Sequence, residues 1–306
     1  MKTIIFTAFM IAAISIVAAQ RPAPAQGPNN STKTSSRMLY HNGPVRTYIQ
    51  DVYFIFYGCW ETPACGPFDG DASTITVLTN FMSSIGNTPY MFINNTYPDS
   101  TGTPATSALV YGGSIIDNSY AHGNELTQAD IEAILNDHIG DPGGQTDLPA
   151  DPQGIYFIIS TADVSSTATG FCVQGAPPFH SFYRLYGTNP VPYGFIGDAH
   201  RCPTLAGPQF LDQTGTRLTT PNGSYDGDSM VATLAHELNG ILTDPYGTGW
   251  FDRYGLENAD KCSGTFGTTY TTSNGARANI HLSGNYDYLI EQNWINGRKG
   301  RCAMYQ

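Results

Sequence analysis

The residues best suited to chemistry lie in one short stretch, residues 230–262. It combines an imidazole with several carboxylates: His236, Glu237, Asp244, Glu257 and Asp260. Such a concentration is unusual in this chain, because only 13% of its residues are charged. Imidazole nitrogens and carboxylate oxygens are common zinc ligands, and a neighbouring Glu can activate a zinc-bound water. The same groups also form structural ion pairs, so the sequence leaves a catalytic and a structural role open.

The spacing of these residues departs from that of a zinc protease helix. In the zincin motif a second His follows the first by four positions, so that both imidazoles project from one helical face. Here the fourth position is Gly240. Two downstream carboxylates could replace the missing ligand: Asp244, eight positions after His236, and Glu257. The metal hypothesis therefore takes zinc as a cofactor and assigns four residues: His236, Asp244 and Glu257 as ligands and Glu237 as the catalytic base.

A structural role is the alternative. In it, His236 hydrogen-bonds a carboxylate at a helix end, and Asp244 caps the turn that starts at Pro245. Asn239-Gly240 is itself a turn signal, and a Gly inside a helix costs about 1 kcal/mol relative to Ala. The helix expected over residues 230–242 therefore either ends early or contains a strained corner. Its expected apolar face consists of Val231, Leu234, Leu238 and Leu242.

The chain before this helix alternates between strand and helix patterns. Strands are expected over residues 52–58, 90–97, 108–117, 154–160, 181–186 and 193–197, and helices over residues 71–85 and 127–139. The second of these helices has a capping box, with Thr127 as N-cap and Asp130 three positions later. This order predicts an α/β (α+β) fold with a mixed sheet flanked by helices, of which a zincin-like arrangement is one form. The tail from Lys261 onward is expected to be loops and short strands.

The N-terminal region indicates export from the cell. Lys2, an apolar run over residues 4–17 and the small residues Ala18 and Ala19 are typical of a secretory signal peptide, predicted over residues 1–19. Residues 20–46 are rich in Pro, Ser, Asn and Gln, so we expect a flexible leader there. Residues 47–306 are expected to form a single domain. No second long apolar run follows, so the predicted mature protein is secreted and has no membrane span.

The cysteines and glycosylation sequons fit the same compartment. An even set of six cysteines in a secreted chain is typical of disulfides, and we expect sequential pairing among many connectivities. The predicted pairs are Cys59–Cys65, Cys172–Cys202 and Cys262–Cys302. The sequons lie at Asn29, Asn30, Asn94 and Asn222.

The charge of the chain argues against nucleic acid and anionic lipid headgroups as partners. The net charge is −11, whereas binding to nucleic acid or to anionic headgroups needs concentrated Lys and Arg. The few basic residues are scattered, apart from a group near the C-terminus: Arg298, Lys299 and Arg301. We therefore expect no nucleic-acid partner.

Several dispersed motifs resemble those of the EXORDIUM-like, phosphate-induced protein family. They are Tyr57-Gly58-Cys59-Trp60, Phe171-Cys172 with the later Phe179-His180, Thr243-Asp244-Pro245, Trp250-Phe251, Glu257 to Cys262, and Asn296 to Lys299. The resemblance covers residues 52–302. It implies a secreted protein associated with the cell wall and growth, whose partner is an extracellular or cell-wall component. The family's second Glu after His236 falls at Gly240, so the resemblance also implies that this chain lacks one potential ligand.

Three hypotheses for the function follow. The leading one is a non-catalytic secreted protein of this family that acts in growth or cell-surface signalling. The second is a metallohydrolase that uses the His-Glu helix. The third is a carbohydrate-binding wall protein, since the 19 tyrosines include candidates for a sugar-stacking surface. The sequence does not decide whether the protein is an enzyme.

Overall fold

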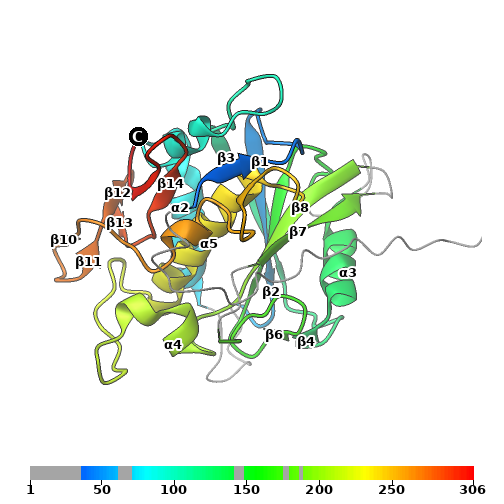
Figure 1. The fold of residues 1–306 in the computed structure, drawn as a ribbon. Helices are drawn as coiled ribbons and strands as arrows, with labels where there is room; N and C mark the ends of the chain where they lie inside the picture. The colour runs from blue at the N-terminus through cyan, green and yellow to red at the C-terminus, as the bar shows by residue number, and fades with distance from the viewer. Residues whose placement is uncertain (1–35, 61–70, 141–147, 175–178, 186–188) are drawn as a thin grey trace, which may run out of the picture.

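A five-stranded mixed sheet lies at the centre of the molecule (Figure 1). The computed structural model describes residues 36–60, 71–140, 148–174, 179–185 and 189–306. In spatial order the strands are β3 (Leu109–Asp117), β2 (Gln50–Tyr57), β5 (Ile155–Ser160), β8 (Asn189–Ile196) and β7 (Phe179–Leu185). The edge strand β7 is antiparallel to β8, and the other neighbours are parallel. The predicted mixed sheet is therefore confirmed, while the zincin likeness stays a prediction.

Both faces of the sheet are covered, which explains the continuous apolar runs in the central strands. Every residue of β5 is buried. Alternate residues of β2 enter opposite cores: Phe54 and Phe56 face one, and Ile55 and Tyr57 face the other. A strand that is buried on both faces has apolar residues at successive positions, because the side chains on either face enter a core rather than solvent.

Helices form the outer layers. Two long helices, α2 (Ala72–Ile85) and α5 (Tyr225–Thr243), contribute to one core, and α3 (Gln128–His138) contributes to the other (Figure 1). Asp71 caps α2 by accepting from the Thr74 amide, and Thr127 with Asp130 forms the predicted capping box of α3. The shorter helices are η2 (Met91–Thr96), α4 (Pro203–Ala206), η3 (Pro208–Phe210) and η4 (Asp260–Cys262). No helix in the described residues is long and apolar enough to cross a membrane.

The remaining strands are short and pair in twos. They are β1 (Met38–Tyr40), β4 (Glu125–Leu126), β6 (Ser165–Ser166), β9 (Trp250–Asp252), β10 (Tyr270–Thr271), β11 (Arg277–Ala278), β12 (Ile280–Leu282), β13 (Tyr286–Tyr288), β14 (Asn293–Ile295) and β15 (Arg301–Ala303). Strand β1 pairs with β9, so this end of the predicted leader is part of the folded domain. The hairpins after α5 agree with the expected short strands of the tail.

Two predicted disulfides are confirmed, Cys172–Cys202 and Cys262–Cys302. Cys59 is also disulfide-bonded, but Cys65, its predicted partner, lies outside the described residues.

The strand predicted over residues 90–97 is wrong, because this segment contains the 3-10 helix η2. At its centre, Asn94 is fully buried and donates to the side chain of Asn239 on α5. A compact turn brings this amide to α5, whereas the apolar neighbours Met91 and Ile93 enter the core beside it.

Burial also affects two of the predicted glycosylation sites. The Asn94 side chain has no exposed surface, and the amide nitrogen of Asn222 donates to both Asp228 and the Asp287 carbonyl. A glycan on either nitrogen is incompatible with these contacts in the folded chain. Asn29 and Asn30 lie outside the described residues.

Candidate functional site

Helix α5 positions the predicted site residues. It begins after Ser224, whose hydroxyl accepts from the Gly227 amide, and therefore starts five residues before the expected position 230. It does not end at the Asn239-Gly240 turn signal but continues to Thr243, with Asp244 as C-cap. Tertiary packing overrides the weak local preference here, because nearly all of the helix after its first turn is buried.

One group of ion pairs surrounds His236, and we call it the His236 cluster: His236, Asp260 and Glu291. The Nδ1 atom of His236 lies 3.1 Å from Glu291 Oε2, and its Nε2 atom lies 3.2 Å from Asp260 Oδ1. Glu291 is fixed in turn, since its second oxygen accepts from the Gly264 amide at 2.6 Å. The cluster therefore connects α5 to η4 and to the segment after β13.

A second group contains the next residue of α5, and we call it the His180 cluster: His180, Glu237 and Glu257. The Nδ1 atom of His180, on the edge strand β7, lies 2.8 Å from Glu237 Oε2. Its Nε2 atom lies 3.3 Å from the Asp244 carbonyl and 3.8 Å from Glu257 Oε1. This cluster joins α5 to the edge of the sheet.

Carboxylates hold both histidines in the charged form. Burial lowers the pKa of His180, but the charge of Glu257 and the hydrogen bond to Glu237 outweigh it and raise the pKa to about 10. Burial likewise lowers the pKa of His236, yet its hydrogen bonds to Asp260 and Glu291 raise that pKa well above the ordinary value. With a carboxylate or carbonyl oxygen at each ring nitrogen, both imidazoles act as double donors.

Because Gly240 has no side chain, the residues of the His180 cluster can approach the backbone of α5 at this position. A Cβ atom at this position would lie 2.5 Å from Glu257 Oε2 and 2.9 Å from His180 Cε1. Both distances are shorter than van der Waals contact, so a side chain here would displace the cluster. The position at which the resemblance implies a second Glu is thus filled from outside the helix by the Glu257 carboxylate.

The residues predicted to bind zinc are not assembled around one point. Asp244 is fully buried, and its Oδ1 atom accepts from the Gly249 amide at 2.6 Å, which is the turn-capping role proposed as the alternative. Glu257 belongs to the His180 cluster, apart from the partners of His236. Among the described residues, no three His, Cys, Asp or Glu side chains are arranged to hold a metal ion. The residues present therefore do not fit the zinc site, and its ligand assignments stay predictions.

The predicted catalytic base is enclosed as well. Glu237 is 1% exposed and gives one oxygen to His180. Its other oxygen, Oε1, has no hydrogen-bond partner within the described part of the chain. The contacts therefore allow the Glu237 carboxylate to form an ion pair with the charged His180 imidazole.

Beside the histidines lies a buried amide cluster: Asn94, Asn239, Asn258 and Asn293. The Asn239 Oδ1 atom accepts from Asn94 and from Asn293, at 2.7 and 2.8 Å. Asn258 donates to Asn94 Oδ1 and to the Asn239 carbonyl. This network joins α5 to η2 and β14 through fully buried polar groups.

The sequence match decides the family. The phosphate-induced protein 1 conserved region matches residues 38–291. The chain belongs to this family. Protein EXORDIUM-like 3 of Arabidopsis thaliana is 28% identical over 287 residues, which cover 84% of this chain and 80% of the relative. Protein EXORDIUM of the same plant is 25% identical over 287 residues, which cover 87% and 85%. No solved structure matches.

The predicted family membership is thereby confirmed, and the residues of both histidine clusters lie within the matched region. Two partners in these clusters were missed from the sequence. Glu291 lies 55 residues after His236 and has no local motif, so only the fold brings it there. In the sequence, His180 stands out only through the Phe179-His180 motif of the family resemblance.

Proposed function

We propose that the protein acts outside the cell as a non-catalytic component of the cell surface or wall, in growth or signalling. Family membership supports this function, because the matched relatives are EXORDIUM and EXORDIUM-like proteins. The disulfides support the extracellular compartment, since such bonds persist where the environment is oxidising.

The observation that carries the non-catalytic part is the closed pairing of the two histidines. Each ring nitrogen of His236 faces a carboxylate of the same chain, and His180 holds the Glu237 carboxylate that a metallohydrolase would need as its base. A catalytic site needs groups that turn toward a substrate-sized hollow. Two hollows on the described surface, one beside the hairpin of β14 and β15 and one at β12 and the C-terminus, are lined by residues outside both clusters. The clusters therefore serve to join α5 to β7 and to the C-terminal hairpins.

Metal analysis of the purified protein tests this function. We expect less than stoichiometric zinc in protein prepared without chelators, and no change in the midpoint of thermal unfolding on addition of EDTA. Stoichiometric zinc that disappears in the His236→Ala variant would overturn the non-catalytic assignment. The second arm follows tagged protein in its own cells: we expect it in the extracellular or wall fraction, and retention in the cytosol would contradict the location.

A further inference from the structure

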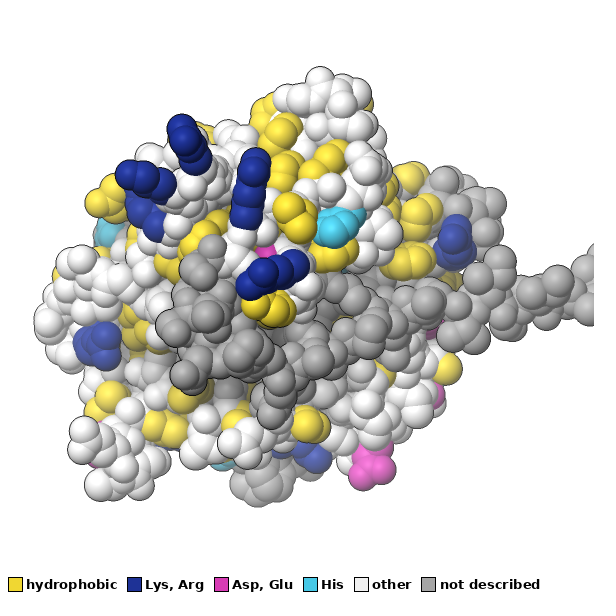
Figure 2. Space-filling model, viewed as in Figure 1, with side chains coloured by type: hydrophobic (Ala, Val, Ile, Leu, Met, Phe, Trp, Pro, Cys, Tyr) yellow, Lys and Arg dark blue, Asp and Glu magenta, His cyan; other side chains and the backbone are white. Residues whose placement is uncertain are grey.

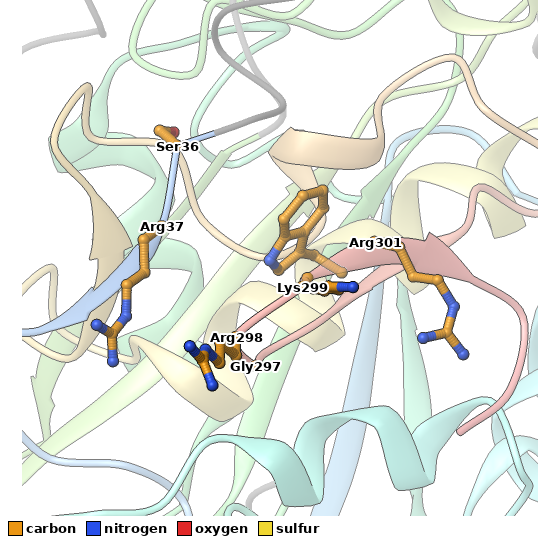
Figure 3. A pocket seen from close by; sticks show the side chains of 8 residues that line it. Ser36, Arg37, Gly297, Arg298, Lys299 and Arg301 are labelled. Carbon is orange, nitrogen blue, oxygen red and sulfur yellow. The ribbon is translucent and has the colours of Figure 1, made fainter.

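A hollow of about 520 Å³ lies beside the hairpin of β14 and β15, and none of its lining residues belongs to the histidine clusters. Its lining comes from the segment at β1 and from this hairpin: Ser36, Arg37, Trp294, Gly297, Arg298, Lys299, Gly300 and Arg301. The volume falls within the range of sites for small ligands. Figure 3 shows Arg37 and Arg298 on one side, Arg301 on the other and Lys299 between them.

The charge of this hollow is opposite to that of the molecule. Four of the eleven Lys and Arg residues in the described chain line it, and no Asp or Glu does, although the net charge of the protein is −11. Figure 2 shows Lys and Arg side chains gathered on this part of the face. A cavity with walls of one charge concentrates the field and attracts ions of the opposite sign. The hollow is therefore suited to an anionic ligand.

The walls of the hollow rest on a buried support. Lys261 contacts two of the lining residues: it donates to the Ser36 carbonyl at 2.7 Å, while Asp252 Oδ2 at 3.2 Å balances its charge. The same ammonium stands 4.4 Å from the centre of the Trp294 ring. A Cβ at Gly300 would lie 2.5 Å from Trp294 Nε1, so the turn that carries the basic residues lies directly against the indole. The cations are thus borne on a backbone fixed by packing.

The positions of the four basic residues around the hollow indicate which class of anionic ligand it fits. Four charges distributed around the hollow match several anionic groups along an extended ligand better than they match one small ion. Guanidinium groups bind carboxylates, as they bind phosphates, with two parallel hydrogen bonds, so a row of carboxylates along a ligand suits this arrangement. Trp294 is only 8% exposed, and the uncovered part of its indole offers one apolar contact to a ring-shaped ligand in the hollow. A membrane surface would instead select an amphipathic helix with an apolar face, not a hollow between a strand and a hairpin.

From this geometry we propose that the hollow binds an acidic oligosaccharide whose sugar units carry carboxylates. Arg37, Arg298, Lys299 and Arg301 pair with these carboxylates, and the hairpin turn lies along the sugar chain. The site rests on the proposed extracellular function and gives it a ligand class, a polyuronate. Because the ion pairs are at the surface, the affinity falls as salt is added.

Titration calorimetry with an oligogalacturonate tests the site. We expect binding by the wild-type protein at low salt, and no binding of the fully methyl-esterified oligomer, which has the same sugar chain without the charges. The triple variant Arg298→Gln/Lys299→Gln/Arg301→Gln should lose roughly tenfold or more in affinity, since each exposed ion pair contributes up to about 1 kcal/mol. The matched control is Arg217→Gln/Arg253→Gln/Arg277→Gln, which removes the same charge from exposed positions elsewhere and should bind within twofold of wild type.

Several outcomes would overturn the site. They are absence of oligogalacturonate binding, equal binding of the methyl ester, and equal losses in the two triple variants, which would show a general charge effect. Binding of inorganic phosphate, poly-glutamate or phosphatidylserine vesicles in place of the oligosaccharide, lost in the first variant, would reassign the hollow. Circular dichroism confirms that each variant is folded. If the protein is secreted but does not bind the oligogalacturonate, only the proposed site is refuted. If it is cytosolic but binds the oligogalacturonate, only the proposed function is refuted.

Discussion

At the scale of single residues, Gly240 decides what the His-Glu helix can do. Its missing side chain lets Glu257 and His180 approach the helix, so the face that a zinc protease uses for a second ligand holds an ion pair instead. The glycine weakens the helix locally by about 1 kcal/mol relative to Ala. The contacts of the His180 cluster offset that loss.

A double-mutant cycle at Gly240 and Glu257 tests this exchange. We expect Gly240→Ala to destabilise the wild-type protein by about 1 kcal/mol, because displacing the Glu257 carboxylate and the His180 ring outweighs the better helix propensity. In a Glu257→Ala background only the contact with the His180 ring at 2.9 Å remains, so the same substitution should cost less than in the wild-type protein. Urea unfolding of the four proteins measures the coupling. An equal cost in both backgrounds would contradict the steric role of Gly240.

At the scale of elements, α5 is the helix that η2, η4, β7 and β14 all contact. Its apolar residues enter the core shared with α2, and its polar residues each face a different neighbour. Asn239 faces η2 and β14, His236 faces η4, and Glu237 faces β7. Buried polar groups of this kind fix orientation as well as stability, because a shifted helix would leave them without partners.

Asn239→Ala is expected to destabilise the protein by about 2–4 kcal/mol. The substitution removes the acceptor of Asn94 and of Asn293 and leaves two buried amide nitrogens with fewer partners. Thermal or urea unfolding gives the change in free energy. The matched control is Asn80→Ala on α2, whose amide bonds only within its own helix and which should change stability by about 0.5 kcal/mol or less. Similar losses in the two variants would rule out the proposed role of the amide cluster.

At the scale of the whole molecule, the two histidine clusters join the sheet, α5 and the C-terminal hairpins, so their charge state affects overall stability. The folded-state pKa of His180, about 10, lies above the unfolded value of about 6.5. A raised pKa contributes stability that is fully present below the unfolded value and is lost as the pH rises through the folded one. The window therefore runs from about pH 6.5 to about pH 10.

Unfolding in urea across this pH window checks the prediction. At pH 6 the His180→Gln variant should be less stable than wild type by about 3 kcal/mol, because it leaves two carboxylates without their cation. The difference should shrink steadily toward pH 10. Replacement of the exposed His281 by Gln serves as the control and should cost about 0.5 kcal/mol or less throughout. A difference that grows with pH would reverse the sign and refute the assignment of His180 as a buried cation.

The sequence by itself determined the local elements and the family. The continuous run of β5, the capping box of α3 and the apolar face of α5 follow from side-chain size and from periodicity, which act over a few residues. Two of the predicted disulfides were also correct. The strand predicted around Asn94 was wrong. The apolar residues around Asn94 fit a strand pattern, and only the fold shows that the Asn94 amide is buried against α5.

Only the tertiary structure decided which charges meet. His236 and Glu257 are close in sequence, yet His236 pairs with Glu291, and Glu257 lies beside His180, on the edge strand of the sheet. The basic hollow likewise needs Arg37 to lie beside the hairpin of Arg298 and Arg301. Electrostatic pairing depends on distance in space, and that distance is set by how the sheet and α5 pack. Of the residues that first suggested a zinc site, His236, Glu237 and Glu257 therefore belong to two ion-pair clusters.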